Sequence, residues 1–101
     1  MTGTYRLTRD AQADIDQAAK WYGDRSPSAA EGFLRAATDT FERAAANPNH
    51  APEIVRGARR RNLNRYPFSA WYVKRDYGIL VFALWHHRLP QDIALARRLT
   101  L

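Results

Sequence analysis

Residues 68–85, FSAWYVKRDYGILVFALW, predict two neighbouring strands joined by a tight turn. Side chains at residues 68–73 alternate between two faces, as they do in a strand: Phe68, Ala70 and Tyr72 against Ser69, Trp71 and Val73. Asp76-Tyr77-Gly78 is a turn signal between the two strands. Residues 79–84 form a nearly unbroken apolar run, which is typical of a central strand that is buried on both faces.

Two further strands are predicted upstream of this pair. Residues 59–63 have a period of two, with Arg59, Arg61 and Leu63 on one face and Arg60 and Asn62 on the other. A one-residue shift of register would exchange Arg59 and Arg61 for Arg60 on a given face of the sheet. Residues 4–8 also alternate, whereas residues 47–57 show no period and are expected to be irregular.

Two helices are predicted between the first strand and the irregular stretch. Residues 11–22 place apolar side chains on one helical face: Ala11, Ile15, Ala18, Ala19 and Tyr22. Residues 33–44 carry a second stripe: Phe33, Ala36, Ala37, Thr40, Phe41 and Ala44. Thr8 can cap the first helix, and Ser26-Pro27 can begin the second. The polar turn between the helices is short, so the two form an antiparallel hairpin.

The order of these elements is typical of a single α+β domain that spans residues 1–101. We expect an antiparallel β-sheet, made of the N-terminal strand and a C-terminal three-strand meander, packed against the α-helical hairpin. Residues 92–99 follow Pro90 and predict a short last helix, with Arg97 and Arg98 at its C-terminal end, where the helix dipole favours cations.

Composition excludes several classes of protein. Hydrophobic residues make up 46% of the chain, which excludes general disorder, and there is no cysteine for a disulfide framework or a thiolate. No signal pattern and no apolar run of membrane-spanning length is visible, so we expect a cytoplasmic protein. His50, His86 and His87 lie without carboxylates at ligand spacing, so we expect no metal and no cofactor.

Positive charge is concentrated in the second half of the chain. Residues 1–50 hold six Lys or Arg and seven Asp or Glu, whereas residues 51–101 hold ten and three. Between Glu53 and Asp76 there are seven basic residues and no acid. Fourteen of the sixteen basic residues are arginine, which binds phosphate and carboxylate through two parallel hydrogen bonds. This pattern predicts an anionic partner.

In order and in length, these elements resemble the RelE/ParE family of bacterial type II toxins, across essentially the whole chain. The residues that carry the resemblance are Tyr5-Arg6-Leu7-Thr8, Trp21-Tyr22, Phe33, Asn47-Pro48, Arg59-Arg60, Arg65-Tyr66-Pro67-Phe68, Trp71-Tyr72, His86-His87-Arg88-Leu89-Pro90 and Arg97. The resemblance implies a small toxin that a cognate antitoxin neutralises, typically by laying an acidic segment over the toxin's basic sheet. RelE-like members cut mRNA in the ribosomal A site, and ParE-like members act on DNA gyrase.

The resemblance leaves the target open. A metal-independent, ribosome-dependent mRNA endonuclease would need cations and a proton-transfer group, and the catalytic candidates for that case are His86, His87, Arg61 and Arg65. The alternative for the two histidines is a strand end, where one packs and the other is solvated. Residues 92–101 contain no Tyr, His or Lys, which departs from the RelE-like pattern and favours a ParE-like toxin that binds gyrase.

Two other functions stay open: a degenerate toxin that only binds its antitoxin, and a plain nucleic-acid binder. In every case the residues expected to contact the target or the antitoxin are mostly arginines: Arg59, Arg60, Arg61, Arg65, Trp71, Arg88, Arg97 and Arg98. The partners expected are therefore an antitoxin, in a hetero-oligomer with this chain, and either gyrase or the ribosome with its mRNA.

Overall fold

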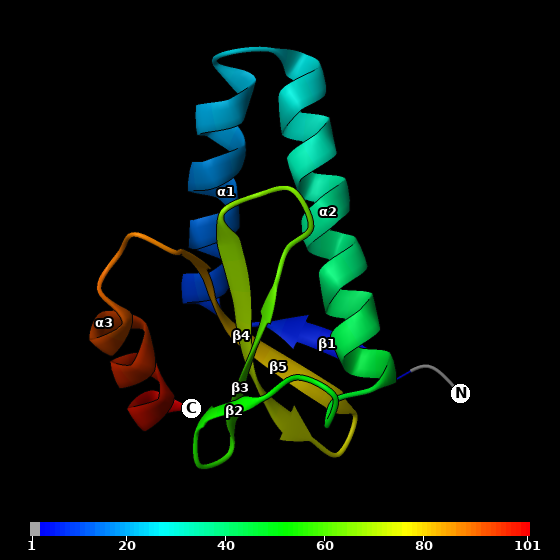
Figure 1. Ribbon diagram of the computed structural model, residues 1–101, viewed down its shortest axis with the longest axis vertical. Coiled ribbons are helices and arrows are strands. Elements are labelled where there is room, and N and C mark those ends of the chain that lie inside the picture. The colour runs from blue at the N-terminus through cyan, green and yellow to red at the C-terminus, as the bar shows by residue number, and fades with distance from the viewer. Residues whose placement is uncertain (1–2) are drawn as a thin grey trace.

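The computed structural model describes residues 3–101, in which a five-stranded sheet carries a helical hairpin on one face and a short helix on the other (Figure 1). The elements are β1 (Thr4–Leu7), α1 (Arg9–Gly23), α2 (Pro27–Ala46), β2 (Glu53–Val55), β3 (Ala58–Asn62), β4 (Phe68–Arg75), β5 (Gly78–His86) and α3 (Gln91–Ala96), followed by a 3-10 turn at Arg97–Thr100. The predicted α+β architecture is confirmed.

The strand order is β1-β5-β4-β3-β2. Strands β2 to β5 pair antiparallel, as expected for a meander. Strand β1, however, pairs parallel with β5, which corrects the prediction of a wholly antiparallel sheet. Its partner is the last strand of the chain, and the direction of such a distant pair cannot be read from the period of either strand. Strand β2 is a second correction, because it lies in the stretch predicted to be irregular.

Both helices of the hairpin begin at the predicted caps. The Thr8 hydroxyl accepts the backbone N–H of Ala11 at 3.1 Å, and the Ser26 hydroxyl accepts that of Ala29 at 3.0 Å. Each bond satisfies an N–H group that the first helical turn leaves without a partner. None of the helices formed by residues 3–101 is long and apolar enough to cross a membrane.

The sheet is buried on both faces. The hairpin packs on Tyr72, Ile79 and Val81, which belong to one apolar cluster with Phe33 and Phe41. A second cluster under α3 contains six buried residues: Ala58, Trp71, Phe82, Ala83, Trp85 and Ala94. The pairing of β4 with β5 shifts register between Trp71 and Tyr72, which places the successive residues Phe82 and Ala83 in the same cluster. The prediction that residues 79–84 form a strand buried on both faces is confirmed.

The parallel pair of β1 and β5 depends on Gly78, and this gives a testable prediction. Gly78 has φ +143°, and a Cβ there would lie 1.9 Å from the Thr4 carbonyl oxygen. We expect Gly78→Ala to lower the free energy of unfolding by about 3 kcal/mol, through backbone strain and displacement of β1. Gly57→Ala is the matched control, because its φ is +84° but no atom lies within 4 Å of the added methyl group. Urea unfolding of both variants checks this, and equal losses would contradict it.

Candidate functional site

The three consecutive arginines of β3 divide between the two faces of the sheet. Arg59 and Arg61 pair in register with Tyr72 and Ala70, which face the helical hairpin. Arg60 pairs with Trp71 on the opposite face, and its guanidinium carbon lies 5.8 Å from the centre of a Trp71 ring. The alternation predicted for β3 is therefore confirmed, and the arginines do not form one continuous surface.

Arg59 is largely committed to contacts within the protein. Its guanidinium donates hydrogen bonds to the backbone carbonyls of Asn49 and Ala51 and pairs with Glu53 at 3.2 Å. The neighbouring Tyr72 hydroxyl donates to the Pro48 carbonyl at 2.9 Å. Burial raises the pKa of Tyr72, and the nearby arginines partly offset that rise. Together these side chains attach the loop after α2 to the sheet.

The two histidines have different surroundings, but they are not neighbours on a strand as predicted, because β5 ends at His86 and His87 lies in the turn after it. The His86 ring packs edge-on against Phe68, with 5.0 Å between ring centres, and its Nδ1 accepts the backbone N–H of Arg88. His87 Nε2 lies 2.9 Å from the Ser69 hydroxyl, which donates its hydrogen to the Asn62 side chain. Because that hydroxyl has one hydrogen, His87 must donate its own N–H to Ser69.

The geometry does not assemble the catalytic set expected of a nuclease. His86 shares the hairpin face with Arg61, but strand β4 lies between β5 and β3. His87 is hydrogen-bonded to Ser69. The residue of β5 that pairs with Ser69 is Trp85, which belongs to the cluster on the α3 face. Arg65 lies in the loop between β3 and β4, where it is exposed and has the left-handed φ of +72°. Within residues 3–101, no hydrogen bond joins the side chain of His86 or His87 to that of Arg61 or Arg65.

An apolar groove opens beside α1, where the ends of β4 and β5 meet the loops that follow β3 and β5. Its volume is about 670 Å³, and it is lined by Asp14, Gln17, Ala18, Trp21, Tyr22, Pro67, Phe68, Leu84, Trp85, His86, Leu89 and Arg97. Trp21 and Leu89 are 52% and 47% exposed. Exposed apolar side chains gathered in a hollow are typical of a surface that binds another protein.

Packed aromatic rings support the groove from beneath. Tyr22 stacks on Phe33 with 5.1 Å between ring centres and meets Tyr66 edge-on at 5.4 Å. Burial, and secondarily the proximity of Tyr66, raises the pKa of Tyr22, so its phenol is neutral at physiological pH. Trp21 packs edge-on against Tyr22 and carries the guanidinium of Arg25 at 3.3 Å from a ring centre. These contacts hold Trp21 at the mouth of the groove in a defined orientation.

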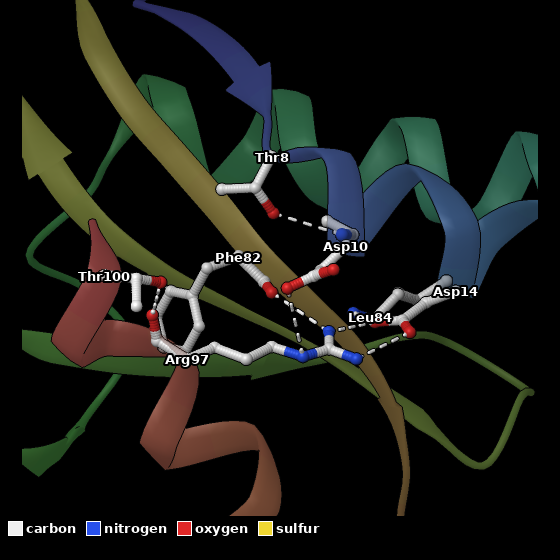
Figure 2. Close-up of polar contacts among 8 residues, drawn as sticks. Thr8, Asp10, Asp14, Phe82, Leu84, Arg97 and Thr100 are labelled. Atoms are coloured by element: carbon white, nitrogen blue, oxygen red, sulfur yellow. Dashed lines mark hydrogen bonds and ion pairs between the residues drawn. The ribbon is translucent and has the colours of Figure 1, made fainter.

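The inner end of the groove is formed by an ion pair between residues that are 83 positions apart. Arg97 donates to both carboxylate oxygens of Asp14, at 2.6 and 3.1 Å, and to the carbonyl of Phe82 at 3.2 Å (Figure 2). The Asp14 carboxylate also accepts the backbone N–H of Leu84 at 3.0 Å. The bond to Asp14 raises the pKa of Arg97, which therefore stays charged. Arg97 also packs against Trp85, at 4.9 Å from a ring centre.

Two of the residues predicted to contact a partner are engaged within the protein. The Arg97 side chain is 21% exposed and serves the Asp14 contact, and Trp71 is 1% exposed beneath α3. The sequence also carries no sign that Trp21 and Leu89 are exposed at the groove that they line. They line one groove although they are 68 positions apart, and no period in the sequence indicates that they meet.

The structure describes no metal centre within residues 3–101, since no group of three or more His, Cys, Asp or Glu side chains there is placed to hold an ion. A second groove, of about 480 Å³, lies at the opposite corner of the sheet and is lined by Asn49, Glu53, Arg56, Gly57, Arg59, Val73, Lys74, Arg75, Arg98 and Leu101. Of the predicted partner-binding arginines, Arg59 and Arg98 line this basic groove. Arg65 and Arg88 are exposed on the neighbouring loops after β3 and β5, which a hydrogen bond from His87 N–H to the Pro67 carbonyl holds together.

Comparison with known proteins identifies relatives of this chain. Residues 5–89 match the family described as ParE toxin of type II toxin-antitoxin system, parDE. A solved chain of the chromosomal ParDE toxin–antitoxin system of P. aeruginosa is 27% identical and superposes with a TM-score of 0.62. That match covers 84% of this chain and 96% of the other. Among curated proteins there is no significant match.

The ion pair at the inner end of the groove gives a prediction for stability. Asp14→Ala removes the acceptor of the Leu84 N–H and the two-point partner of the Arg97 guanidinium, which keeps only the Phe82 carbonyl and the Asp10 carboxylate at 3.9 Å; the Asp14 side chain is 13% exposed. We expect the free energy of unfolding to fall by about 3 kcal/mol. Asp39→Ala is the matched control, because Asp39 is a helical acid whose pair with Arg43 is exposed, and it should cost at most about 0.5 kcal/mol. Urea unfolding measures both, and similar losses would refute the role assigned to Asp14.

Proposed function

This chain belongs to the ParE toxin family of type II toxin–antitoxin systems, and on that basis we propose that it inhibits DNA gyrase by binding to it and is neutralised by a cognate antitoxin. It is the toxin component of such a module. The observation that carries the proposal is the apolar groove, in which Trp21 and Leu89 are exposed on a rigid aromatic base.

The groove suits a protein partner in both shape and composition. Tryptophan is among the residues that contribute most to protein–protein affinity, because it buries a large area at low entropic cost. Trp21 lies at the mouth of the groove and is held by Tyr22 and Arg25, so little of its freedom remains to be lost on binding. A partner that covers Trp21 and Leu89 would bury apolar surface that the isolated toxin exposes to water.

The placement of the histidines supports inhibition by binding over cleavage of mRNA. His87 is hydrogen-bonded to Ser69, and Nδ1 of His86 is occupied by the Arg88 N–H. Within residues 3–101 neither ring is hydrogen-bonded to an arginine side chain, the group that would stabilise a pentavalent phosphorane. The exposed arginines Arg65 and Arg88 are proposed as a cationic margin to the groove, where charge speeds association with an acidic partner.

The antitoxin is proposed to act on the same groove. An apolar segment in the groove, flanked by acidic residues that meet Arg65 and Arg88, would match both the shape and the charge of this surface. Such a segment would hide Trp21 from gyrase, so neutralisation would follow from competition for one surface.

A supercoiling assay with purified gyrase tests the proposal. We expect the wild-type toxin to inhibit supercoiling and Trp21→Ala to need about 30-fold more protein for the same inhibition, which corresponds to about 2 kcal/mol. Leu34→Ala is the matched control, because Leu34 is a 41% exposed apolar residue on α2 and does not line the groove. His87→Ala should retain full inhibition.

Three outcomes would contradict the proposal. The first is gyrase that stays fully active with excess wild-type toxin. The second is mRNA cut within codons on translating ribosomes, with loss of cleavage in folded His87→Ala. The third is equal loss of inhibition in the Trp21 and Leu34 variants, which would remove the groove from the mechanism.

A further inference from the structure

The basic groove lies apart from the apolar groove and is built from different segments. Arg56 comes from the turn between β2 and β3, Lys74 and Arg75 from the end of β4, and Arg98 from the turn after α3. Arg59 is the fifth cation that lines it. Three parts of the chain that are distant in sequence, residues 56–59, 74–75 and 98, therefore bring positive charge to one hollow of about 480 Å³.

Most of this charge is not neutralised within the protein. Glu53 is the one acidic side chain that lines the groove, and its carboxylate is paired with Arg59 at 3.2 Å. Within residues 3–101, Arg56, Lys74 and Arg98 form no ion pair, and all three are exposed. Like charges that gather without internal partners repel one another, so the arrangement gains stability when an anion enters.

We propose that the basic groove binds the sugar–phosphate backbone of double-stranded DNA, so that the toxin contacts the DNA on which gyrase acts as well as the enzyme. Arg56, Lys74 and Arg98 make the phosphate contacts, and Arg59 fixes the floor of the groove through Glu53 and the loop after α2. This inference rests on the proposed function for its choice of DNA, because DNA is the substrate of gyrase.

The composition of the groove favours phosphate over an acidic protein segment. A peptide gains affinity and specificity from apolar pockets for its side chains, and only Val73 and Leu101 give this groove apolar lining. Arginine, by contrast, matches phosphate with two parallel hydrogen bonds, and backbone contacts need no apolar pocket. The apolar groove supplies the surface that a protein partner requires, which leaves the basic groove for a partner recognised by charge alone.

The distribution of charge over the molecule also favours DNA binding through the sheet. Residues 1–50, which include the whole helical hairpin, hold one more acid than base, whereas residues 51–101 hold ten bases and three acids. The electrostatic field of the protein therefore attracts a polyanion to the sheet and not to the helical hairpin. The hairpin and the apolar groove beside it then stay accessible to a protein bound to the same DNA.

The test measures binding to a 20-base-pair fluorescent duplex by anisotropy at several salt concentrations. Each phosphate contact contributes about 0.9 to the slope of log affinity against log salt, so Arg56→Gln/Arg98→Gln should lower the slope by about 1.8. Lys20→Gln/Arg35→Gln is the matched control, because it removes the same charge from exposed positions on α1 and α2. That control should leave the slope of the wild type unchanged.

Other results would overturn the inference. They are absence of duplex binding by the wild type, equal changes in the two double variants, and tighter binding of a poly-glutamate peptide than of duplex at the same salt. Supercoiling inhibition measured on the same preparations separates this inference from the proposed function. Duplex binding without gyrase inhibition refutes the proposed function alone, and gyrase inhibition without duplex binding refutes the role given to the basic groove alone.

Discussion

The incomplete edge of strand β5 is the constraint on which the rest of the structure depends. Strand β1 pairs with β5 only as far as Val81, whose carbonyl accepts the N–H of Thr8 at 3.0 Å. Beyond that point the backbone of β5 has polar groups but no neighbouring strand on this side within residues 3–101. A buried N–H or carbonyl without a partner costs about 1–3 kcal/mol. Asp14 and Arg97 meet this need at Leu84 and Phe82, so an ion pair continues the hydrogen bonding that β1 ends.

The early end of β1 also creates the apolar groove. Thr8 must leave the sheet because its hydroxyl caps α1, and the edge of β5 that it uncovers becomes a wall of the groove. Helix α1 supplies Trp21 and Tyr22 to the opposite wall, and Arg97 closes the inner end. The ion pair that completes the sheet thus holds α1 and the C-terminal segment in the positions that shape the groove. A change at Asp14 would therefore affect both the stability of the fold and the shape of the groove.

The sequence carries the elements of this fold more clearly than their assembly. Periods of two and of 3.6 and one apolar run identify four of the five strands and both helices of the hairpin, and Thr8 and Ser26 mark where these helices begin, because these signals are local. The parallel direction of β1 and the Asp14–Arg97 pair are not local, since each joins residues more than 70 positions apart. Arg97 and Arg98 are neighbouring arginines that the sequence does not distinguish. Arg97, however, is paired with Asp14 inside the protein, whereas Arg98 lines the basic groove. Only the geometry of α3 and the turn after it separates their roles.

The division of the molecule into an apolar groove and a basic groove explains a feature of the sequence that folding alone does not require. The core needs apolar side chains from residues 68–85, but it has no use for the excess of arginine that surrounds them. Arg59 and Arg97 are used for internal contacts, and each has an acid beside it. Within residues 3–101, Arg56, Lys74 and Arg98 form no ion pair. Their mutual repulsion could be removed by substitution at little cost to the fold. This unneutralised charge is the basis of the DNA contact that we propose for the basic groove.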